Sequence, residues 1–193
     1  MNPEKFQNKY RVPSARATWH DYNGGDYFIT ICTAGRLHYF GEIENGEMHK
    51  NVLGHKLDEL IQETKTHNPY SEIPLYKIMP NHVHLIVCID AACRDAACHV
   101  FTGEPGKNEK MRDIANRCGL LSTVIGGLKS ALTKYANLNK IKFGWQSRFH
   151  DHIIRNQEEM ERIVIYIENN VLSWEMDKFY TRYTTSIQGN DLL

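Results

Sequence analysis

The hydrophobic positions in the first half of the chain form short runs separated by polar turn signals, a pattern typical of β-strands. The stretch DYFITICTAG (26–35) is rich in β-branched and aromatic residues and predicts a strand. The stretch RLHYFGEIENGEMH follows it, and its Asn-Gly pair predicts a turn within a continuing meander. The stretch LYKIMPNHVHLIVCI (75–89) predicts a strand pair, or one long strand interrupted at Pro80.

Three other segments carry their apolar residues at helical spacing. Residues 53–67 place leucine and isoleucine on one face and stop at an Asn-Pro pair. Residues 119–138 also predict a helix, despite a Gly-Gly pair that costs about 1 kcal/mol per glycine relative to alanine. Residues 156–177 begin with Asn156 as an N-cap and glutamates in the first turn, where they favour the helix dipole.

The order of these elements predicts the fold class. Residues 143–155 have the aromatic and β-branched content of a further strand, whereas residues 91–112 lose periodicity and predict an inserted flexible loop. The resulting order of strands and helices indicates an α+β fold, with helices packed on a mainly antiparallel sheet. A length of 193 residues with 41% hydrophobic content suits one domain over residues 1–193.

The cellular setting follows from what the sequence does not carry. No apolar stretch approaches the roughly 20 residues that span a bilayer, and the N-terminal residues have no apolar signal region, so we expect a soluble, cytoplasmic protein. The cysteines are odd in number and clustered, which favours reduced thiols over a disulfide framework. Four residues fit zinc spacing only loosely, because a Cys-x2-Cys pair is missing, and we expect no zinc site there. The cysteines are Cys32, Cys88, Cys93, Cys98 and Cys118, and the zinc candidates are Cys88, Cys93, Cys98 and His99.

The charge balance is informative only by region. The 23 basic residues equal the 23 acidic ones, which by itself argues against a nucleic-acid-binding protein. However, residues 107–155 carry ten basic and three acidic side chains, and residues 156–177 carry six acidic side chains and one arginine. Such asymmetry lets one face meet a polyanion while the whole chain stays neutral, although ordinary solvated helix faces explain it equally well.

Two histidines stand one residue apart within the most apolar stretch of the sequence. In a strand, His82 and His84 point to the same face about 7 Å apart, while Val83 and Leu85 point to the other. Two imidazoles supply half of a metal site. The alternative is that they are strand histidines that only make hydrogen bonds.

The last predicted helix carries a second candidate pair. Tyr166 lies about 120° from the centre of the apolar stripe, and Asn170 lies about 80° from it on the same side. These two side chains could enter a cleft together, or Tyr166 could be a boundary residue with its hydroxyl in water. The apolar stripe consists of Met160, Ile163, Val164, Ile167 and Val171.

Three motifs together resemble a known family. MPNHVHLIV, the downstream WQSRFHDHIIR and then YIENN closely resemble the single-tyrosine transposases of the HUH superfamily, especially the REP-associated tyrosine transposases of bacteria. The resemblance covers nearly the whole chain, and its most specific part is the stretch around His-x-His. It implies a ferredoxin-like (RRM-like) nuclease fold. The chain departs from many relatives at Asn169-Asn170-Val171, where they have an Asn-Pro pair.

The resemblance also implies residue roles. His82, His84 and Asn170 would bind a divalent ion, Mg²⁺ or Mn²⁺, and Tyr166 would be the nucleophile. A phenol with a pKa of about 10 is a poor nucleophile at neutral pH, so a metal must polarise the phosphate. The product would be a 5′-phosphotyrosine and a free 3′-OH, and attack by another 3′-OH would rejoin strands without ATP.

The partners implied by the resemblance are single-stranded DNA, usually as a hairpin, and a second copy of the chain. Trp145, Phe149 and Tyr135 could stack bases, or could pack in the core instead. Ile165 and Leu172 lie one heptad apart, away from the apolar stripe, which favours a homodimer. The basic candidates for holding phosphates, each of which could also be a solvated charge, are Lys129, Lys134, Arg148 and Arg155.

Three alternatives stay open. Plasmid relaxases and replication initiators share the superfamily, but they often carry a third metal histidine or place the tyrosine before the histidines. A host-adopted protein could bind hairpin DNA without cutting it. A strand-borne metal protein with no role on DNA is the least specific interpretation.

Overall fold

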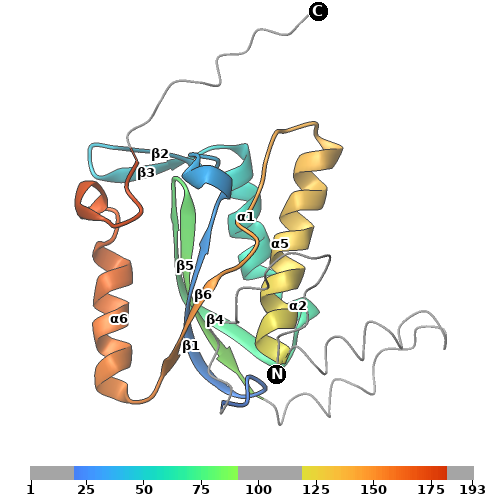
Figure 1. Cartoon of the computed structure of the whole chain (residues 1–193), viewed down its shortest axis with the longest axis vertical. Helices are drawn as coiled ribbons and strands as arrows, with labels where there is room; N and C mark the ends of the chain where they lie inside the picture. The colour runs from blue at the N-terminus through green and yellow to red at the C-terminus, as the bar shows by residue number, and fades with distance from the viewer. Residues whose placement is uncertain (1–19, 91–118, 182–193) are drawn as a thin grey trace, which may run out of the picture.

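A four-stranded antiparallel sheet forms the centre of the molecule. The computed structural model describes residues 20–90 and 119–181 (Figure 1). The strand order is β4-β5-β1-β6, and every neighbouring pair is antiparallel. The strands are β1 (Gly25–Cys32), β4 (Ser71–Met79), β5 (His82–Ile89) and β6 (His150–Ile154).

Helices cover both faces of this sheet. Helices α1 (Val52–Gln62) and α5 (Leu120–Leu138) lie on one face, with the short α2 (Thr64–His67) beside them, and α6 (Gln157–Asn169) lies on the other (Figure 1). The elements β1, α1, β4, β5, α5 and β6 follow the βαββαβ order of ferredoxin-like folds. The predicted α+β fold is therefore confirmed.

Alternation along the two central strands separates the core from the candidate site. On β1 and β5, one set of side chains packs into a single hydrophobic core with α1 and α5, and its members include Ile29, Val83 and Leu85. The side chains between them, including Thr30 and His84, face α6 instead. The period-two pattern thus puts the histidines on the face of the sheet that lies against α6.

The region 75–89 forms the strand pair rather than one long strand, with Pro80 and Asn81 in the turn. The Asn-Gly turn is also present: Asn45 and Gly46 have φ values of 52° and 77°, as a tight hairpin turn requires. That hairpin, β2 (Gly41–Glu44) with β3 (Glu47–Lys50), forms a separate two-stranded sheet instead of extending the main one.

The predicted helix over residues 53–67 is divided in two. Asn51 caps α1 by accepting hydrogen bonds from the backbone N–H groups of Leu53 and Gly54, each at 3.0 Å. The helix ends at Gln62, and Glu63 separates it from α2. A side chain at Gly54 would collide with the carbonyl oxygen of Phe40, so the glycine permits this close approach of α1.

The last helix begins as predicted but is shorter than predicted. Asn156 accepts a hydrogen bond from the backbone N–H of Glu159 at 2.9 Å, which confirms the N-cap. The helix ends at Asn169 and not at residue 177, because the chain turns back to bury Trp174 in the short helix η2 (Trp174–Met176). Of the five residues in the predicted apolar stripe, only Ile167 is fully buried.

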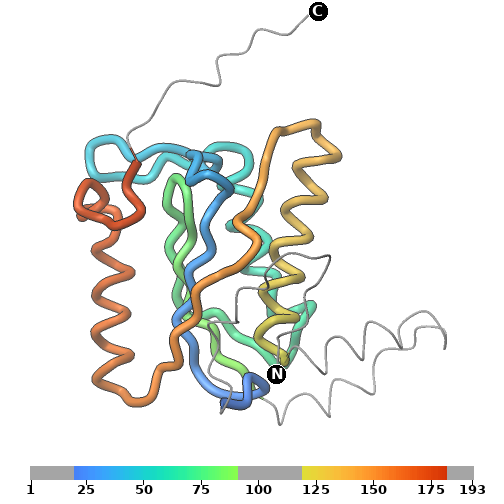
Figure 2. Tube along the Cα trace, viewed as in Figure 1, coloured from blue at the N-terminus to red at the C-terminus, as the bar shows by residue number. Residues whose placement is uncertain are grey.

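The predicted strand over residues 143–155 is also shorter in the structure. Only His150–Ile154 pairs as β6, and the residues before it contribute one isolated bridge, from Trp145 to Thr33. The aromatic content of this stretch serves packing, since the Trp145 ring lies 5.3 Å from that of Phe40. Figure 2 follows the chain from the end of α5 along β6 and, after a turn, into α6.

The remaining predictions concern parts of the chain that the structure describes only in part. The proposed insertion at 91–112 lies outside the described residues, as do three of the four zinc candidates and Cys118. Cys32 and Cys88 are free thiols. Within residues 20–90 and 119–181, no helix combines the length and apolar character needed to cross a membrane.

Candidate active site

His82 and His84 lie side by side on the central strand β5 and face α6. Their side chains are 0% and 1% exposed, and their Nε2 atoms are 3.0 Å apart. Two nitrogens at this separation cannot both present bare lone pairs to each other, so a proton or a cation belongs between them. Metal–ligand bonds of about 2.1 Å at right angles would place two ligand atoms about 3 Å apart. The pair therefore has the spacing of two adjacent corners of an octahedral site.

The outer nitrogen of each imidazole is held by a neighbouring side chain. Asn81 donates from Nδ2 to the carbonyl oxygen of Phe179 at 2.9 Å, so its Oδ1 is the acceptor for Nδ1 of His82 at 2.8 Å. This fixes the proton of His82 on Nδ1 and leaves Nε2 as a lone pair. The Nδ1 atom of His84 lies 2.9 Å from the hydroxyl of Thr30. Such outer partners orient histidine ligands in metal sites.

Burial keeps both histidines neutral. It lowers the pKa of His82 to about 3, with smaller contributions from the charges of Lys178 and Arg36. Burial also holds the pKa of His84 well below its ordinary value, and His82 adds to the effect. Neutral imidazole is the form that binds metal ions, so the pair is ready for a ligand at physiological pH.

Tyr166 reaches the histidine pair from α6. Its hydroxyl lies 3.3 Å from Nε2 of His84 and donates to Oδ2 of Asp177 at 3.2 Å. The ring packs edge-on against Phe28 and is 40% exposed, so one side remains open to a substrate. Burial, and then the nearby carboxylate, raise the pKa of Tyr166 to about 12. The phenol is therefore protonated at rest and needs positive charge nearby to act as a nucleophile.

Asn170 and Asp177 complete the cluster. Asn170 is 2% exposed, and its Nδ2 donates to Oδ2 of Asp177 at 2.9 Å. Its Oδ1 is the one buried side-chain oxygen or nitrogen in the described part of the chain that has no hydrogen-bond partner. One ligand atom each from His82, His84 and Asp177 lie within 4.8 Å of one another.

These groups fit a divalent metal ion. Two imidazoles and a carboxylate are near one another, and the buried amide oxygen of Asn170 lacks the partner that a cation would supply. Mixed nitrogen and oxygen ligands suit Mn²⁺, and the oxygen ligands suit Mg²⁺. The His82, His84 and Asp177 cluster is thus a candidate metal site, and Tyr166 stands at its edge.

Sequence reasoning missed Asp177. It identified the acidic stretch but placed Asp177 in a continuous helix, three turns beyond Tyr166. The useful signal was the Asn169-Asn170 pair, because asparagine has a low helix propensity and the helix ends at Asn169. Asn81 and Thr30 were also missed as partners of the histidines.

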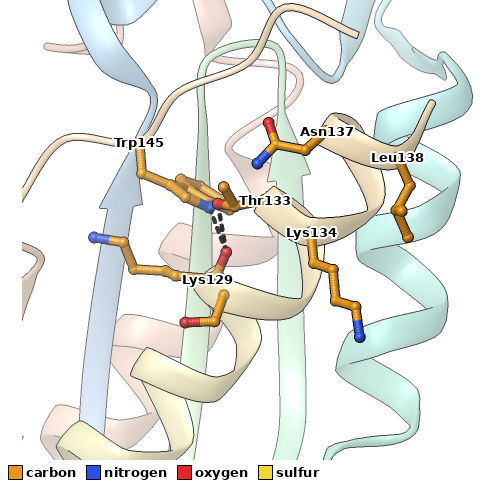
Figure 3. Close-up of a pocket in the computed structure, with 7 residues that line it drawn as sticks. Lys129, Thr133, Lys134, Asn137, Leu138 and Trp145 are labelled. Atoms are coloured by element: carbon orange, nitrogen blue, oxygen red, sulfur yellow. Dashed lines mark hydrogen bonds between the residues drawn. The ribbon is translucent and has the colours of Figure 1, made fainter. Parts of the chain in front are cut away.

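The predicted DNA contacts are not gathered at one place. Lys129 and Lys134 line a shallow groove along α5 together with Trp145 (Figure 3), on the face of the sheet opposite α6. Arg148 and Arg155 are exposed but do not line this groove, and Arg155 lies between β6 and α6.

The groove combines the charges of Lys129 and Lys134 with the indole ring of Trp145. The indole N–H of Trp145 donates to the carbonyl oxygen of Lys129 at 3.2 Å, and the hydroxyl of Thr133 donates to the same oxygen at 2.8 Å, as the two dashed lines in Figure 3 show. The ammonium group of Lys129 donates to the carbonyl oxygen of Gln146 at 2.7 Å, and burial lowers its pKa. Trp145, Phe149 and Tyr135 all pack against the core, so packing accounts for these three aromatic residues.

Ile165 on α6 and Leu172 in the turn after it are exposed apolar residues, and because α6 ends at Asn169 they do not lie one heptad apart on a helix as predicted. Ile165 is 58% exposed and Leu172 is 75% exposed. Leu172 lines a hollow together with Gly46 and Met48 of the β2–β3 hairpin, so part of its surface lies beside another element of the same chain. The predicted homodimer depends on the apolar surface that remains exposed at these two residues.

Comparisons with known proteins give one relative and a shared fold. No family model matches the sequence. An uncharacterised protein of Haemophilus influenzae is 30% identical over 169 residues, which is 86% of this chain and 92% of that protein. A solved REP-associated tyrosine transposase bound to a REP hairpin superposes with a TM-score of 0.52 at 19% identity, covering 83% of this chain and 74% of its own. A predicted transposase of Deinococcus radiodurans gives a TM-score of 0.37 at 14% identity, covering 82% of this chain and 97% of its own.

Proposed function

We propose that this chain cleaves and rejoins single-stranded DNA through Tyr166. The chain belongs to the same family as the Haemophilus influenzae protein and shares the fold of the REP-associated tyrosine transposase. The observation that carries the proposal is the position of the Tyr166 hydroxyl, 3.3 Å from Nε2 of the buried His84, beside His82, whose Nδ1 is held by Asn81. A tyrosine at the edge of a metal site, accessible from one side, is the arrangement that phosphodiester cleavage by a phenol requires.

His82, His84 and Asn170 are the proposed ligands of a divalent ion, Mg²⁺ or Mn²⁺, with Asp177 beside them. When bound, the ion would polarise the phosphodiester and offset the negative charge that develops on it. The chain's own contribution is to keep both imidazoles neutral, to fix their orientation through Asn81 and Thr30, and to shield them from water. The ring of Phe179 shields His82 from water, and the centroids of the two rings are 4.8 Å apart.

In the proposed reaction, the phenol oxygen of Tyr166 attacks the phosphorus of the scissile phosphodiester. The bond from phosphorus to the 3′ oxygen breaks, and the proton lost by the phenol is balanced by the one gained at the released 3′ oxygen. One strand end is then a 5′-phosphotyrosine and the other a free 3′-OH. Attack by a 3′-OH on the phosphotyrosine reverses these changes and restores the tyrosine, so joining needs no ATP.

The DNA partner is proposed to be a single-stranded hairpin with flanking bases. The structural neighbour is bound to a REP hairpin, and the basic side chains of this chain suit phosphates. Lys129 and Lys134 in the α5 groove are the proposed backbone contacts on one face, and Arg148 and Arg155 are the proposed contacts near β6. The protein would act on chromosomal DNA in the bacterial cytoplasm.

Incubation with a labelled hairpin and Mn²⁺ tests the proposal. We expect a shortened strand and a protein-linked strand, both abolished by chelator. Binding without either product would support the non-catalytic hairpin-binding alternative, and failure to bind any hairpin would contradict a role on DNA. A hairpin with a scrambled stem sequence separates structure-specific from sequence-specific recognition.

A further inference from the structure

We propose that Asp177 is a positioning residue that sets both Tyr166 and the ligand oxygen of Asn170. A single carboxylate oxygen, Oδ2, accepts hydrogen bonds from the Tyr166 hydroxyl at 3.2 Å and from the Asn170 amide at 2.9 Å. The inference rests on the proposed function, since it assigns a role within that site. Its main readout is ion binding without DNA, which does not depend on cleavage.

The orientation of the Asn170 amide follows from the chemistry of its neighbour. A carboxylate only accepts hydrogen bonds, so the NH₂ end of the amide must face Asp177. Its Oδ1 then points elsewhere, and in the described part of the chain this buried oxygen has no hydrogen-bond partner. Asp177 therefore determines which end of the amide is left for a cation. Without it, the amide could turn and present N–H groups, which cannot bind a metal.

The backbone brings Asp177 to this place through the turn after α6. Trp174 is 7% exposed and its ring lies 6.0 Å from that of His82, so its burial folds the chain back over the site. Beyond it, Oδ1 of Asp177 accepts the backbone N–H of Phe179 at 2.6 Å. The two carboxylate oxygens thus have separate tasks, because Oδ1 holds the turn and Oδ2 holds Tyr166 and Asn170.

The same short segment also supports the histidines. The carbonyl oxygen of Phe179 accepts from Asn81 Nδ2 at 2.9 Å, and Asn81 Oδ1 in turn holds His82. Arg36 lies over the Phe179 ring and donates to the carbonyl oxygen of Lys178 at 3.3 Å. Residues 177–179 therefore connect the nucleophile, the amide ligand and one imidazole in a single hydrogen-bonded network.

The substitution Asp177→Asn separates the two tasks. An amide oxygen at the Oδ1 position still accepts from Phe179, so the turn is kept. The new NH₂ group replaces Oδ2, and it would donate to the Asn170 oxygen and turn that amide the wrong way. We expect the affinity for Mn²⁺, measured by calorimetry in the absence of DNA, to fall about 10-fold to 100-fold. Glu175→Gln is the matched control, because it removes one exposed charge two residues away and should leave the affinity unchanged.

A swap of the two residues tests positioning against loss of charge at residue 177. The double variant Asn170→Asp, Asp177→Asn restores an acceptor and a donor facing each other and keeps an oxygen for the ion, so Mn²⁺ affinity should return to within about threefold of the wild type. Should the single amide variant not fold, Asp177→Ser, whose hydroxyl can still accept from Phe179, carries the same expectation.

Two results would overturn the inference: wild-type Mn²⁺ affinity in the folded Asp177→Asn variant, or a loss of affinity that the swap does not restore. In the second case the carboxylate would act on the ion directly from residue 177. If the wild type binds Mn²⁺ and these variants behave as expected but no hairpin is cleaved, the proposed function fails and the positioning role stands.

Discussion

Acidification should destabilise the ion-free protein through His82 and His84. Both are buried, and burial lowers the pKa of His82 to about 3 and that of His84 well below its ordinary value. In the unfolded chain both imidazoles titrate near a pKa of about 6.5. The unfolded state therefore takes up protons that the folded state excludes. Stability is fully present above pH of about 6.5 and is lost as the pH falls towards the folded pKa.

The magnitude follows from proton linkage. When the pH falls from about 7.5 to 5.5, each such histidine lowers the free energy of unfolding by about 1.4 kcal/mol, so the pair lowers it by about 2.7 kcal/mol. Because burial lowers the pKa of His38 as well, the total loss includes a further contribution of the same sign. The double variant His82→Gln, His84→Gln isolates the pair, and each single variant should remove about half of their effect.

Urea denaturation at both pH values, in the presence of chelator, measures these differences. The loss of unfolding free energy on acidification should be smaller in the double variant by about 2.7 kcal/mol. An equal loss in the wild type and the double variant would refute the reasoning, because the histidines would then be open to protons in the folded state.

Three further predictions concern the ion, the DNA and the dimer. Mn²⁺ at 100 times its dissociation constant should add about 2.7 kcal/mol to the free energy of unfolding and raise the Tm by about 5–11 °C. If a His82→Ala, His84→Ala variant still melts at a higher temperature with Mn²⁺, the metal assignment is contradicted. Lys134→Ala should weaken hairpin binding across sequences and reduce the slope of log affinity against log salt by about 1, whereas an unchanged slope would remove Lys134 from the DNA interface. Light scattering at tens of micromolar should show a dimer that Leu172→Ser weakens, and a strictly monomeric wild type would contradict the role proposed for Ile165 and Leu172.

Short-range patterns placed the residues of each half of the candidate site on a shared face, and the family resemblance assigned their roles. The period-two alternation of β5 placed His82 and His84 on one face, because their neighbours Val83 and Leu85 fill the core. The N-cap at Asn156 fixed where α6 begins, and the four-residue spacing then placed Tyr166 and Asn170 together. Each of these inferences depends only on residues within one element.

Long-range contacts decided what the sequence could not predict. In a continuous helix, Asp177 would lie about 16 Å along the axis from Tyr166. The burial of Trp174 against His82, which lies far away in the sequence, folds the chain back and brings the carboxylate to 3.2 Å from the hydroxyl. Likewise, the aromatic residues before β6 pack on Phe40 and do not extend the strand.

The most direct test of the proposed chemistry is mass spectrometry of the protein after reaction with a cleavable hairpin and Mn²⁺. We expect a nucleotide adduct on Tyr166 and no adduct in Tyr166→Phe. That variant keeps the ring against Phe28 and loses only the hydroxyl that contacts His84 and Asp177, so it should fold. An adduct on a different tyrosine, or a DNA-linked band that persists in Tyr166→Phe, would contradict the assignment of Tyr166 as the nucleophile.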